Sequence, residues 1–216
     1  MSGNEQLFGI IGVTMRMSIA SSVTALLLGV PPGLLLSMLN FRGKKAVIVM
    51  NRTLMGLPPV VCGLICYMLF SGVGPLRHLH LLYTVKGMVI AQVILITPMI
   101  INSIETFMKG RSGEIRETAK GLRLSGGKTF LLTMNECKYQ LISTYLLAFS
   151  RAIAEVGAIS MVGGAIAYKT NVMTTAIMNY TNMGNFTLGV ALGMILLAIS
   201  LAINIFISFI QTRVDR

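Results

Sequence analysis

The chain has 216 residues, of which 54% are hydrophobic and only 12% are charged, and its formal net charge is +11. A soluble domain usually carries about 25% charged residues, so this composition excludes an ordinary soluble protein and indicates an integral membrane protein. The positive charge does not indicate nucleic-acid binding, because the basic residues stand in short gaps between apolar runs. We therefore expect an all-α membrane protein with lipid, and no nucleic acid, around it.

Five apolar runs are candidates for membrane-spanning helices. A helix needs about 20 residues to cross roughly 30 Å of hydrocarbon. Residues 1–16 are too polar and too short for a span, so we expect there only a short amphipathic helix on the outer surface, and no removed signal peptide. The predicted spans cover residues 17–39, 53–76, 87–104, 139–167 and 186–210.

Proline and glycine shape the first of these runs. Pro31 and Pro32 stand near its inner end, where prolines kink a helix. Gly29 and Gly33 are spaced to form a small face for close contact with another helix. The first span is therefore predicted to be kinked and closely packed.

The connecting segments carry little that indicates a metal site. His78 and His80 fall in a predicted outer loop at residues 77–86, and two histidines with no third ligand nearby are more typical of a loop. Residues 168–185 are predicted to form a second, polar outer loop. Cys62 and Cys66 are interpreted as packing residues, and Cys137 falls in segment 105–138, which is expected to lie in the reducing cytoplasm. We predict no metal site and no disulfide.

The basic residues predict an orientation. Thirteen Lys and Arg fall in the loop before residue 53, in segment 105–138 and in the tail, against four in the segments on the opposite side. Cytoplasmic loops carry the excess of Lys and Arg. The N-terminus is thus predicted to lie outside and the C-terminus in the cytoplasm.

Segment 105–138 is a polar island between apolar runs. It holds a large share of the chain's 18 basic and seven acidic residues. Glu114 and Glu117 follow Ser112 as carboxylates do in the first turns of a helix, and Gly126–Gly127 indicates a turn. A connection of this length usually has a function. We predict short helices on the cytoplasmic face that dock a partner.

The fourth run carries two charges, Arg151 and Glu155. Arg151 lies roughly 19 Å along a helix from Lys138, near the bilayer centre, where an arginine costs roughly 2.5–3.5 kcal/mol. Glu155 follows one helical turn later, on the same face, so the two can pair. The pair is interpreted either as part of a pathway or gate, or as a structural salt bridge.

Small residues follow this pair. The fourth run is longer than one crossing needs, and we expect a helix break at Gly163–Gly164. Irregular backbone at membrane depth must line a cavity or be buried in protein. Gly157, Gly163 and Gly164 therefore join the candidate gate. No nucleophile–base set, metal-ligand set or phosphate loop is visible, so we do not predict an enzyme.

The island also carries a family resemblance. Glu117-Thr118-Ala119, followed by Leu122, Ser125 and Phe130, resembles the EAA loop of ABC-importer permeases. This resemblance implies a coupling helix that sits in a cleft of the ATP-binding subunit. The family's glycine after this helix is Arg123 here, and its usual Leu-Pro is Glu136–Cys137. The residues expected to couple to the ATPase are Glu114, Glu117, Thr118, Ala119, Gly121, Leu122 and Ser125.

The rest of the chain resembles the permeases of oxyanion importers, closest to the tungstate type. The motifs are Arg151-Ala-Ile-Ala-Glu155-Val-Gly157-Ala, then Met161-Val-Gly163-Gly164, then Val172-Met173-Thr174-Thr175. Ala165 stands where those permeases commonly have Asn. The resemblance implies a single transmembrane domain over residues 1–216 with the ABC type I importer permease fold, in a bacterial or archaeal plasma (inner) membrane.

The same resemblance implies partners. Two copies of the chain would form the translocation pathway, two ATP-binding subunits would dock on the islands, and an extracytoplasmic tungstate-binding protein would deliver the anion. This chain has no Walker motif, so it is expected to hold no cofactor, with ATP on the partner subunit. A molybdate or sulfate permease is the alternative within the class. A passive ion channel is the alternative from another class.

Overall fold

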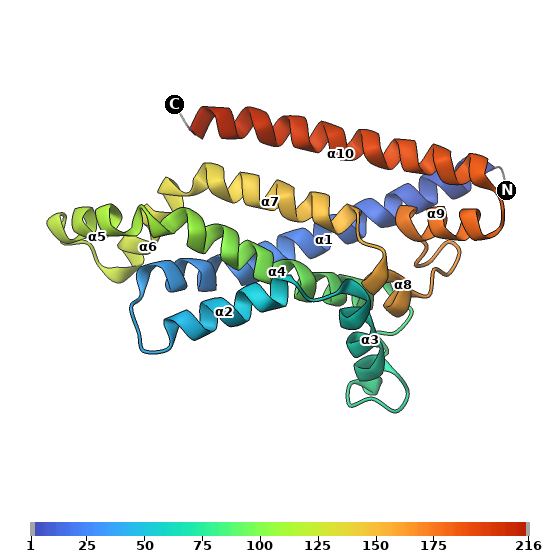
Figure 1. Ribbon diagram of the computed structural model, residues 1–216, viewed down its shortest axis with the longest axis horizontal. Coiled ribbons are helices and arrows are strands. Elements are labelled where there is room, and N and C mark those ends of the chain that lie inside the picture. Colours follow the sequence, from blue (N-terminus) through green and yellow to red (C-terminus); the bar gives the residue numbers. More distant parts are fainter. Residues whose placement is uncertain (1–2, 215–216) are drawn as a thin grey trace.

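The computed structural model describes the backbone of residues 3–214 and the side chains of residues 7–209. No strand occurs in this part of the chain, so the all-α prediction is confirmed for it (Figure 1). The helices, in order, are α1 (Gly3–Met38), α2 (Lys44–Met55), α3 (Pro59–Phe70), the 3-10 helix η1 (Arg77–Leu79), α4 (Val85–Lys109), α5 (Ser112–Gly121), α6 (Gly126–Glu136), α7 (Lys138–Ile153), α8 (Gly157–Gly163), α9 (Met173–Asn182) and α10 (Phe186–Val214).

The first helix begins earlier than predicted. α1 is continuous from Gly3, and its apolar stretch long enough to span a membrane begins at Leu7, so the separate surface helix over residues 1–16 is wrong. Polar groups there are satisfied inside the protein: the Thr14 hydroxyl donates to the carbonyl of Ile10 and accepts from the amide of Met173 in α9. A buried polar residue of this kind does not end a span.

The second predicted span is two helices. α2 and α3 meet at 94° across the break at residues 56–58, so a single helix over residues 53–76 is wrong. Pro58 is extended and Pro59 opens α3, because proline suits the first turn of a helix but not its interior. α2 itself begins at Lys44, inside the predicted basic loop.

The later spans agree better with the sequence. α4 contains the predicted third span and continues through Pro98, and α10 contains the fifth. The fourth run divides into α7 and α8, which meet at 59°. The polar loop predicted at residues 168–185 is wrong in its middle, because α9 forms there with Met173 and Ala176 buried.

Three helices are long and apolar enough to cross a membrane, and the number rises to five if each bent pair is one span. Figure 1 shows α1, α4, α7 and α10 running along the long axis, with α5 and α6 at one end and α8 and α9 at the other. The described start of α1 and the described end of α10 lie at opposite ends. This arrangement gives the molecule a charged end and an apolar body.

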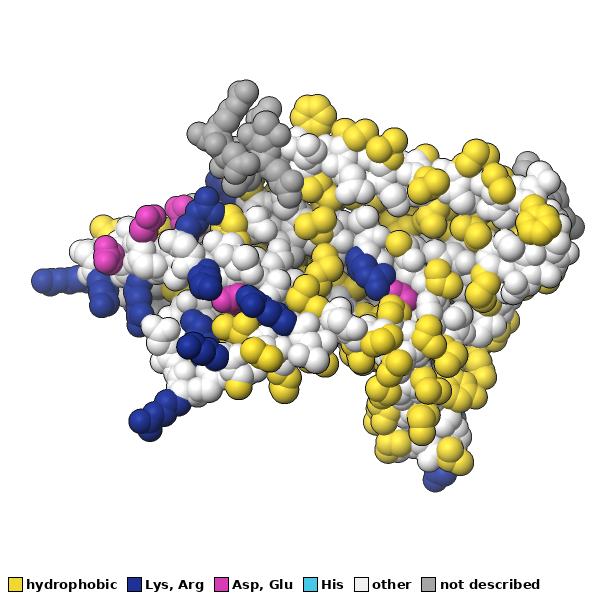
Figure 2. Space-filling view, in the orientation of Figure 1, with side chains coloured by type: hydrophobic (Ala, Val, Ile, Leu, Met, Phe, Trp, Pro, Cys, Tyr) yellow, Lys and Arg dark blue, Asp and Glu magenta, His cyan; other side chains and the backbone are white. Residues whose placement is uncertain are grey.

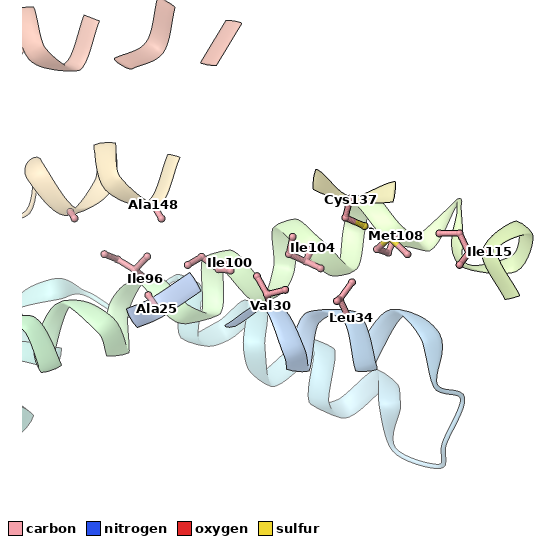
Figure 3. Packing of buried hydrophobic residues seen from close by; sticks show 11 residues of the cluster. Ala25, Val30, Leu34, Ile96, Ile100, Ile104, Met108, Ile115, Cys137 and Ala148 are labelled. Carbon is pink, nitrogen blue, oxygen red and sulfur yellow. Dashed lines mark hydrogen bonds between the residues drawn. The ribbon is translucent and has the colours of Figure 1, made fainter. Parts of the chain in front are cut away.

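The core lies between α1 and α4 (Figure 3). The predicted glycine face is confirmed: a Cβ on Gly29 would lie 2.8 Å from Ile100 Cγ2, and one on Gly33 would lie 3.0 Å from Ile104 Cβ. In a membrane, close van der Waals packing at small residues holds helices together, since lipid is as apolar as their side chains. α4 is therefore packed closely against α1, and the functional elements lie beside it.

Candidate functional site

The polar island forms two short helices, as predicted. α5 and α6 are joined by a turn at residues 122–125. The amide of Leu124 bonds the carbonyl of Ala119 at 2.9 Å, and the amide of Arg123 bonds that of Lys120 at 3.0 Å. This pair of bonds is the Schellman motif that ends many helices. The motif therefore forms here although Arg123 stands where the resemblance implies glycine.

Arg123 occupies the left-handed position of this motif. Its φ is 48°, a conformation that favours glycine and costs another L-residue about 1–2 kcal/mol. Arg123 therefore raises the conformational free energy of the turn relative to glycine. The turn still has the geometry of the Schellman motif.

The predicted coupling residues do not all face outward. Ala119 is buried, together with Ile115, so both anchor α5 and neither can contact a partner. The remaining six predicted residues are exposed: Glu114, Glu117, Thr118, Gly121, Leu122 and Ser125. They can serve as contacts.

Exposed apolar side chains accompany these polar ones. Leu122 is 64% exposed, Phe130 42% and Leu131 70%. Apolar side chains held outside on a charged surface are typical of a binding face. Leu131 was not predicted, and its only signal in the sequence was its position next to Phe130. We call Leu122, Phe130 and Leu131 the apolar docking residues, and the exposed surface of α5 and α6 that carries them the docking face.

A buried sulfur contact ties the island to the end of α4. The Cys137 thiol donates to the Met108 sulfur at 2.9 Å, and both side chains are fully buried. Burial raises the pKa of Cys137 to about 11, with Arg111 opposing the rise and Glu136 adding to it. Cys137 is therefore a protonated packing residue at neutral pH.

The ion pair predicted in the fourth run is present, at the break between α7 and α8. Arg151 Nη1 lies 2.7 Å from Glu155 Oε2. The two residues do not share a helix as predicted, because α7 ends at Ile153 and Glu155 lies in the break. The other carboxylate oxygen accepts from the amide of Ala158 at 3.3 Å. Arg⁺ at the end of α7 and Glu⁻ at the start of α8 both suit the helix dipoles.

The two partners differ in exposure. The Glu155 side chain is 5% exposed and that of Arg151 is 43% exposed. Neighbouring elements hold the backbone around them: the Thr174 hydroxyl donates to the carbonyl of Glu155 at 2.8 Å, and the Gln92 amide donates to that of Ala152 at 2.7 Å. α4 and α9 thus fix the break, while the Arg151 side chain remains partly exposed.

An exposed guanidinium at this depth needs a polar neighbour. Figure 2 shows the charged side chains gathered at one end of the molecule, with an isolated blue and magenta group among the yellow side chains of the body. Facing lipid would be costly for such a group. This face therefore fits water, a second protein surface or a passing ion.

The predicted glycines lie at close helix contacts. A Cβ on Gly157 would lie 2.9 Å from Val60 Cγ2, and one on Gly163 would lie 2.7 Å from the Met88 sulfur. Gly164 ends α8 with φ 66°, beside the Tyr83 ring. The predicted break at Gly163–Gly164 is confirmed, and the break before Gly157 was missed.

Gly63 was also missed. A Cβ on it would lie 2.7 Å from the Cα of Ala158, so α3 and α8 touch almost backbone to backbone. Glu155, α8 and α3 form one packed unit at the end of α7 remote from the island. α7, with 16 residues, is about 24 Å long, and it connects that unit to the docking face.

Sequence comparisons identify relatives of this chain. The tungstate uptake system permease protein TupB of Peptoclostridium acidaminophilum is 35% identical over 98% of this chain and 92% of its own length. TupB of Campylobacter jejuni is 36% identical over 76% of this chain and 69% of its own length. The molybdate/tungstate transport system permease protein WtpB of Pyrococcus furiosus is 30% identical over 89% of this chain and 74% of its own length.

A family model matches nearly the whole chain. Residues 13–216 fit the family described as binding-protein-dependent transport system inner membrane component. That range includes α4, the docking face and the ion pair. The chain belongs to this family of ABC-transporter permeases, and it is a permease subunit that is not itself an enzyme.

Proposed function

We propose that this chain is the permease subunit of an ATP-driven tungstate importer, in which two copies form the pathway. The observation that carries the proposal is the 35% identity, over 98% of the chain, with a tungstate uptake permease. Two ATP-binding subunits would dock on α5 and α6, and an extracytoplasmic binding protein would deliver tungstate. The membrane would be a bacterial or archaeal plasma membrane, with the N-terminus outside and the C-terminus in the cytoplasm.

The composition of the docking face supports its proposed role as the binding site for the ATP-binding subunits. It combines the apolar docking residues with exposed carboxylates at Glu114 and Glu117. A desolvated apolar centre with a polar rim is the usual anatomy of an interface. Ile115 of α5 is buried in the same apolar cluster as Met108 at the end of α4, so a displacement of α5 would be transmitted to that end.

The break between α7 and α8, which holds the Arg151–Glu155 pair, supports the proposal that this region is the gate. ATP-driven movement of the docking face would be carried along α7 to Arg151 and the break after Ile153. Bent helix pairs at α2–α3 and α7–α8 provide joints between rigid segments. Opening would move α8 relative to α3, and the exposed Arg151 would meet the dianion only in passing.

Two alternatives are weaker. The family depends on binding proteins, so a passive channel, which needs none, is no longer favoured. A molybdate permease stays the second candidate, because the relative from Pyrococcus furiosus carries both molybdate and tungstate in its name.

The test is reconstitution with the ATP-binding subunit and binding protein encoded beside this chain. ATPase activity is measured with the binding protein loaded with tungstate, molybdate or sulfate. We expect the largest stimulation with tungstate. Equal or greater stimulation by molybdate or sulfate would contradict the substrate assignment, and no association with any ATPase would contradict the importer.

A variant pair tests the docking face in the same preparation. Leu131→Gln should weaken co-purification of the ATP-binding subunit, because it removes an exposed apolar contact. Val73→Gln is the matched control, since Val73 is 96% exposed near the opposite end, in the turn after α3. Equal co-purification of both variants with the ATPase would place the docking face elsewhere.

A further inference from the structure

A second charged feature lies beside the docking face and has no part in the coupling described above. It is a pocket of about 630 Å³ between the end of α1, one side of α2, the last turns of α4 and the start of α5. It lies between the docking face and the apolar body, at the predicted cytoplasmic end. A volume of this size is large enough for a small ion with its water.

The lining of this pocket is strongly basic. The single acidic group in it is Glu105, which is 5% exposed, and Arg52 lies 3.9 Å from its carboxylate. Arg52 also donates from Nε to the Asn102 side chain at 3.3 Å. Five basic side chains line the pocket: Lys44, Lys45, Arg52, Lys109 and Arg116.

The start of α5 adds donors to these cations. Ser112 and Gly113 line the pocket as the first two residues of α5. The first amides of a helix have no partner within the helix, and they carry the positive end of its dipole. The cap residue, Arg111, makes no side-chain capping bond, and Gly113 has no neighbour within 4 Å of a Cβ position. The backbone here is open to a ligand.

We propose that this pocket binds a tetrahedral oxyanion group, held by the basic side chains and the first amides of α5. Helix N-termini flanked by Lys and Arg are a recurrent way of holding phosphate-like groups. Glu105 keeps Arg52 in place and leaves the remaining cations free of any carboxylate among the pocket-lining residues. The pocket therefore has a net positive charge. A bound anion would supply the negative charge that its basic side chains lack.

Two sources supply this chemistry: a free oxyanion in the cytoplasm, or the phosphate of an anionic lipid. The first rests on the proposed function, since the transported dianion would pass here on its way out. The second does not, because basic pockets at the cytoplasmic side of membrane helices bind lipid headgroups. The experiment separates the two.

The test uses the full-length chain in nanodiscs, with Val49→Cys as reporter. Val49 lines the pocket and is 62% exposed, while the native cysteines are buried and should be silent. Rates of modification are compared for an anionic and a cationic methanethiosulfonate reagent. In phosphatidylcholine nanodiscs we expect the anionic reagent to react faster by about tenfold, because basic clefts concentrate anions. Tungstate or inorganic phosphate, but not chloride at equal ionic strength, should slow the reaction several-fold.

Matched charge removal assigns the effect to the pocket. The triple variant Lys45→Gln, Lys109→Gln and Arg116→Gln should remove both the tenfold preference and the protection. A control triple, at Arg42, Lys120 and Lys128, removes the same charge from exposed sites outside the pocket and should leave both in place. Equal behaviour of the two triples, or no protection by either oxyanion, would overturn the proposal.

Lipid composition identifies the source. If phosphatidylglycerol nanodiscs abolish the preference in the wild-type pocket, and the pocket triple no longer responds to the lipid, the lipid phosphate is the occupant. Protection by tungstate that persists in both lipids assigns the pocket to a free oxyanion. This readout needs neither ATP nor transport, so a failed importer assay and a failed pocket assay are distinguishable.

Discussion

In each of the two ion pairs formed by the described residues, the carboxylate is buried and the arginine is half exposed. Glu105 and Glu155 have side chains 7% and 5% exposed, against 57% for Arg52 and 43% for Arg151. In each pair the buried carboxylate lies against one guanidinium nitrogen, while much of the arginine side chain stays exposed. Positive charge is thus displayed on a surface that a passing anion can meet, without leaving an unpaired buried charge.

The Arg151–Glu155 pair should be energetically coupled. Glu155→Gln keeps an oxygen for the amide of Ala158 but loses the charge, so stability should fall and ATPase stimulation by loaded binding protein should be impaired. A double-mutant cycle with Arg151→Gln, measured by thermal unfolding in detergent, should give a coupling energy of roughly 0.5–3 kcal/mol. The lower half of that range is expected, because Arg151 is partly solvated.

The cycle also separates the two interpretations of this pair. A structural salt bridge predicts a loss of stability with normal ATPase stimulation in the folded fraction. A gate predicts impaired stimulation even where the variant is fully folded. Additive single variants with unchanged stimulation would remove both roles.

Arg123 offers a test in which a substitution should stabilise the protein. Because its φ is 48°, Arg123→Gly should raise the stability of the α5–α6 turn relative to Arg123→Ala by about 1 kcal/mol. Both variants lose the same side chain, so their difference reports on the backbone alone. Thermal unfolding is the measurement, and an equal or lower midpoint for the glycine variant would show that the left-handed turn is absent.

At the scale of elements, the long apolar runs, the α5–α6 turn and the break at Gly163–Gly164 could be predicted, whereas the breaks before α3 and α8 were missed. α4 and α10 follow from uninterrupted hydrophobic sequence, and α5 and α6 follow from a polar cap and a glycine pair. Pro58 and Pro59 mark the division before α3 locally, whereas the division before α8 depends on contacts between segments distant in sequence. The Gly63–Ala158 contact is one such case, because no local pattern says which glycine meets another helix.

The contact between α3 and α8 should be sensitive to a single methyl group. Gly63→Ala places a Cβ 2.7 Å from the Cα of Ala158, and backbone cannot yield as a flexible side chain does. Overpacking of this kind costs about 1–3 kcal/mol, and it should also impair ATPase stimulation if α8 moves against α3.

Two matched substitutions complete this comparison. Gly72→Ala meets nothing within 4 Å and should be neutral, while Gly163→Ala meets only the flexible Met88 side chain and should cost less than Gly63→Ala. The three unfolding midpoints should rank Gly72→Ala, Gly163→Ala, Gly63→Ala from highest to lowest. A neutral Gly63→Ala would mean that α3 and α8 are not in close contact.

At the scale of the whole molecule, the distribution of charged residues agrees with the direction in which the long helices run. The helices along the long axis carry the chain back and forth between an apolar end, with α3, α8 and α9, and a charged end, with α5 and α6 (Figures 1 and 2). Five passages result if α2–α3 and α7–α8 each count as one. The positive-inside rule then puts α5 and α6 in the cytoplasm, but charge alone cannot say whether the sharply bent α2–α3 pair crosses or returns.

Labelling of single cysteines decides this point. If α2–α3 crosses, Arg42→Cys in the loop between α1 and α2 should react with a membrane-impermeant maleimide only in inverted vesicles, as Lys128→Cys in α6 should. Val73→Cys in the turn after α3 should react in intact cells. All three sites are exposed, and the native cysteines are buried, so background labelling should be low. If Arg42→Cys instead reacts in intact cells, as Val73→Cys does, the α2–α3 pair is a re-entrant loop. The N-terminus would then share a side with α5 and α6, because only the two crossings of α1 and α4 would separate them.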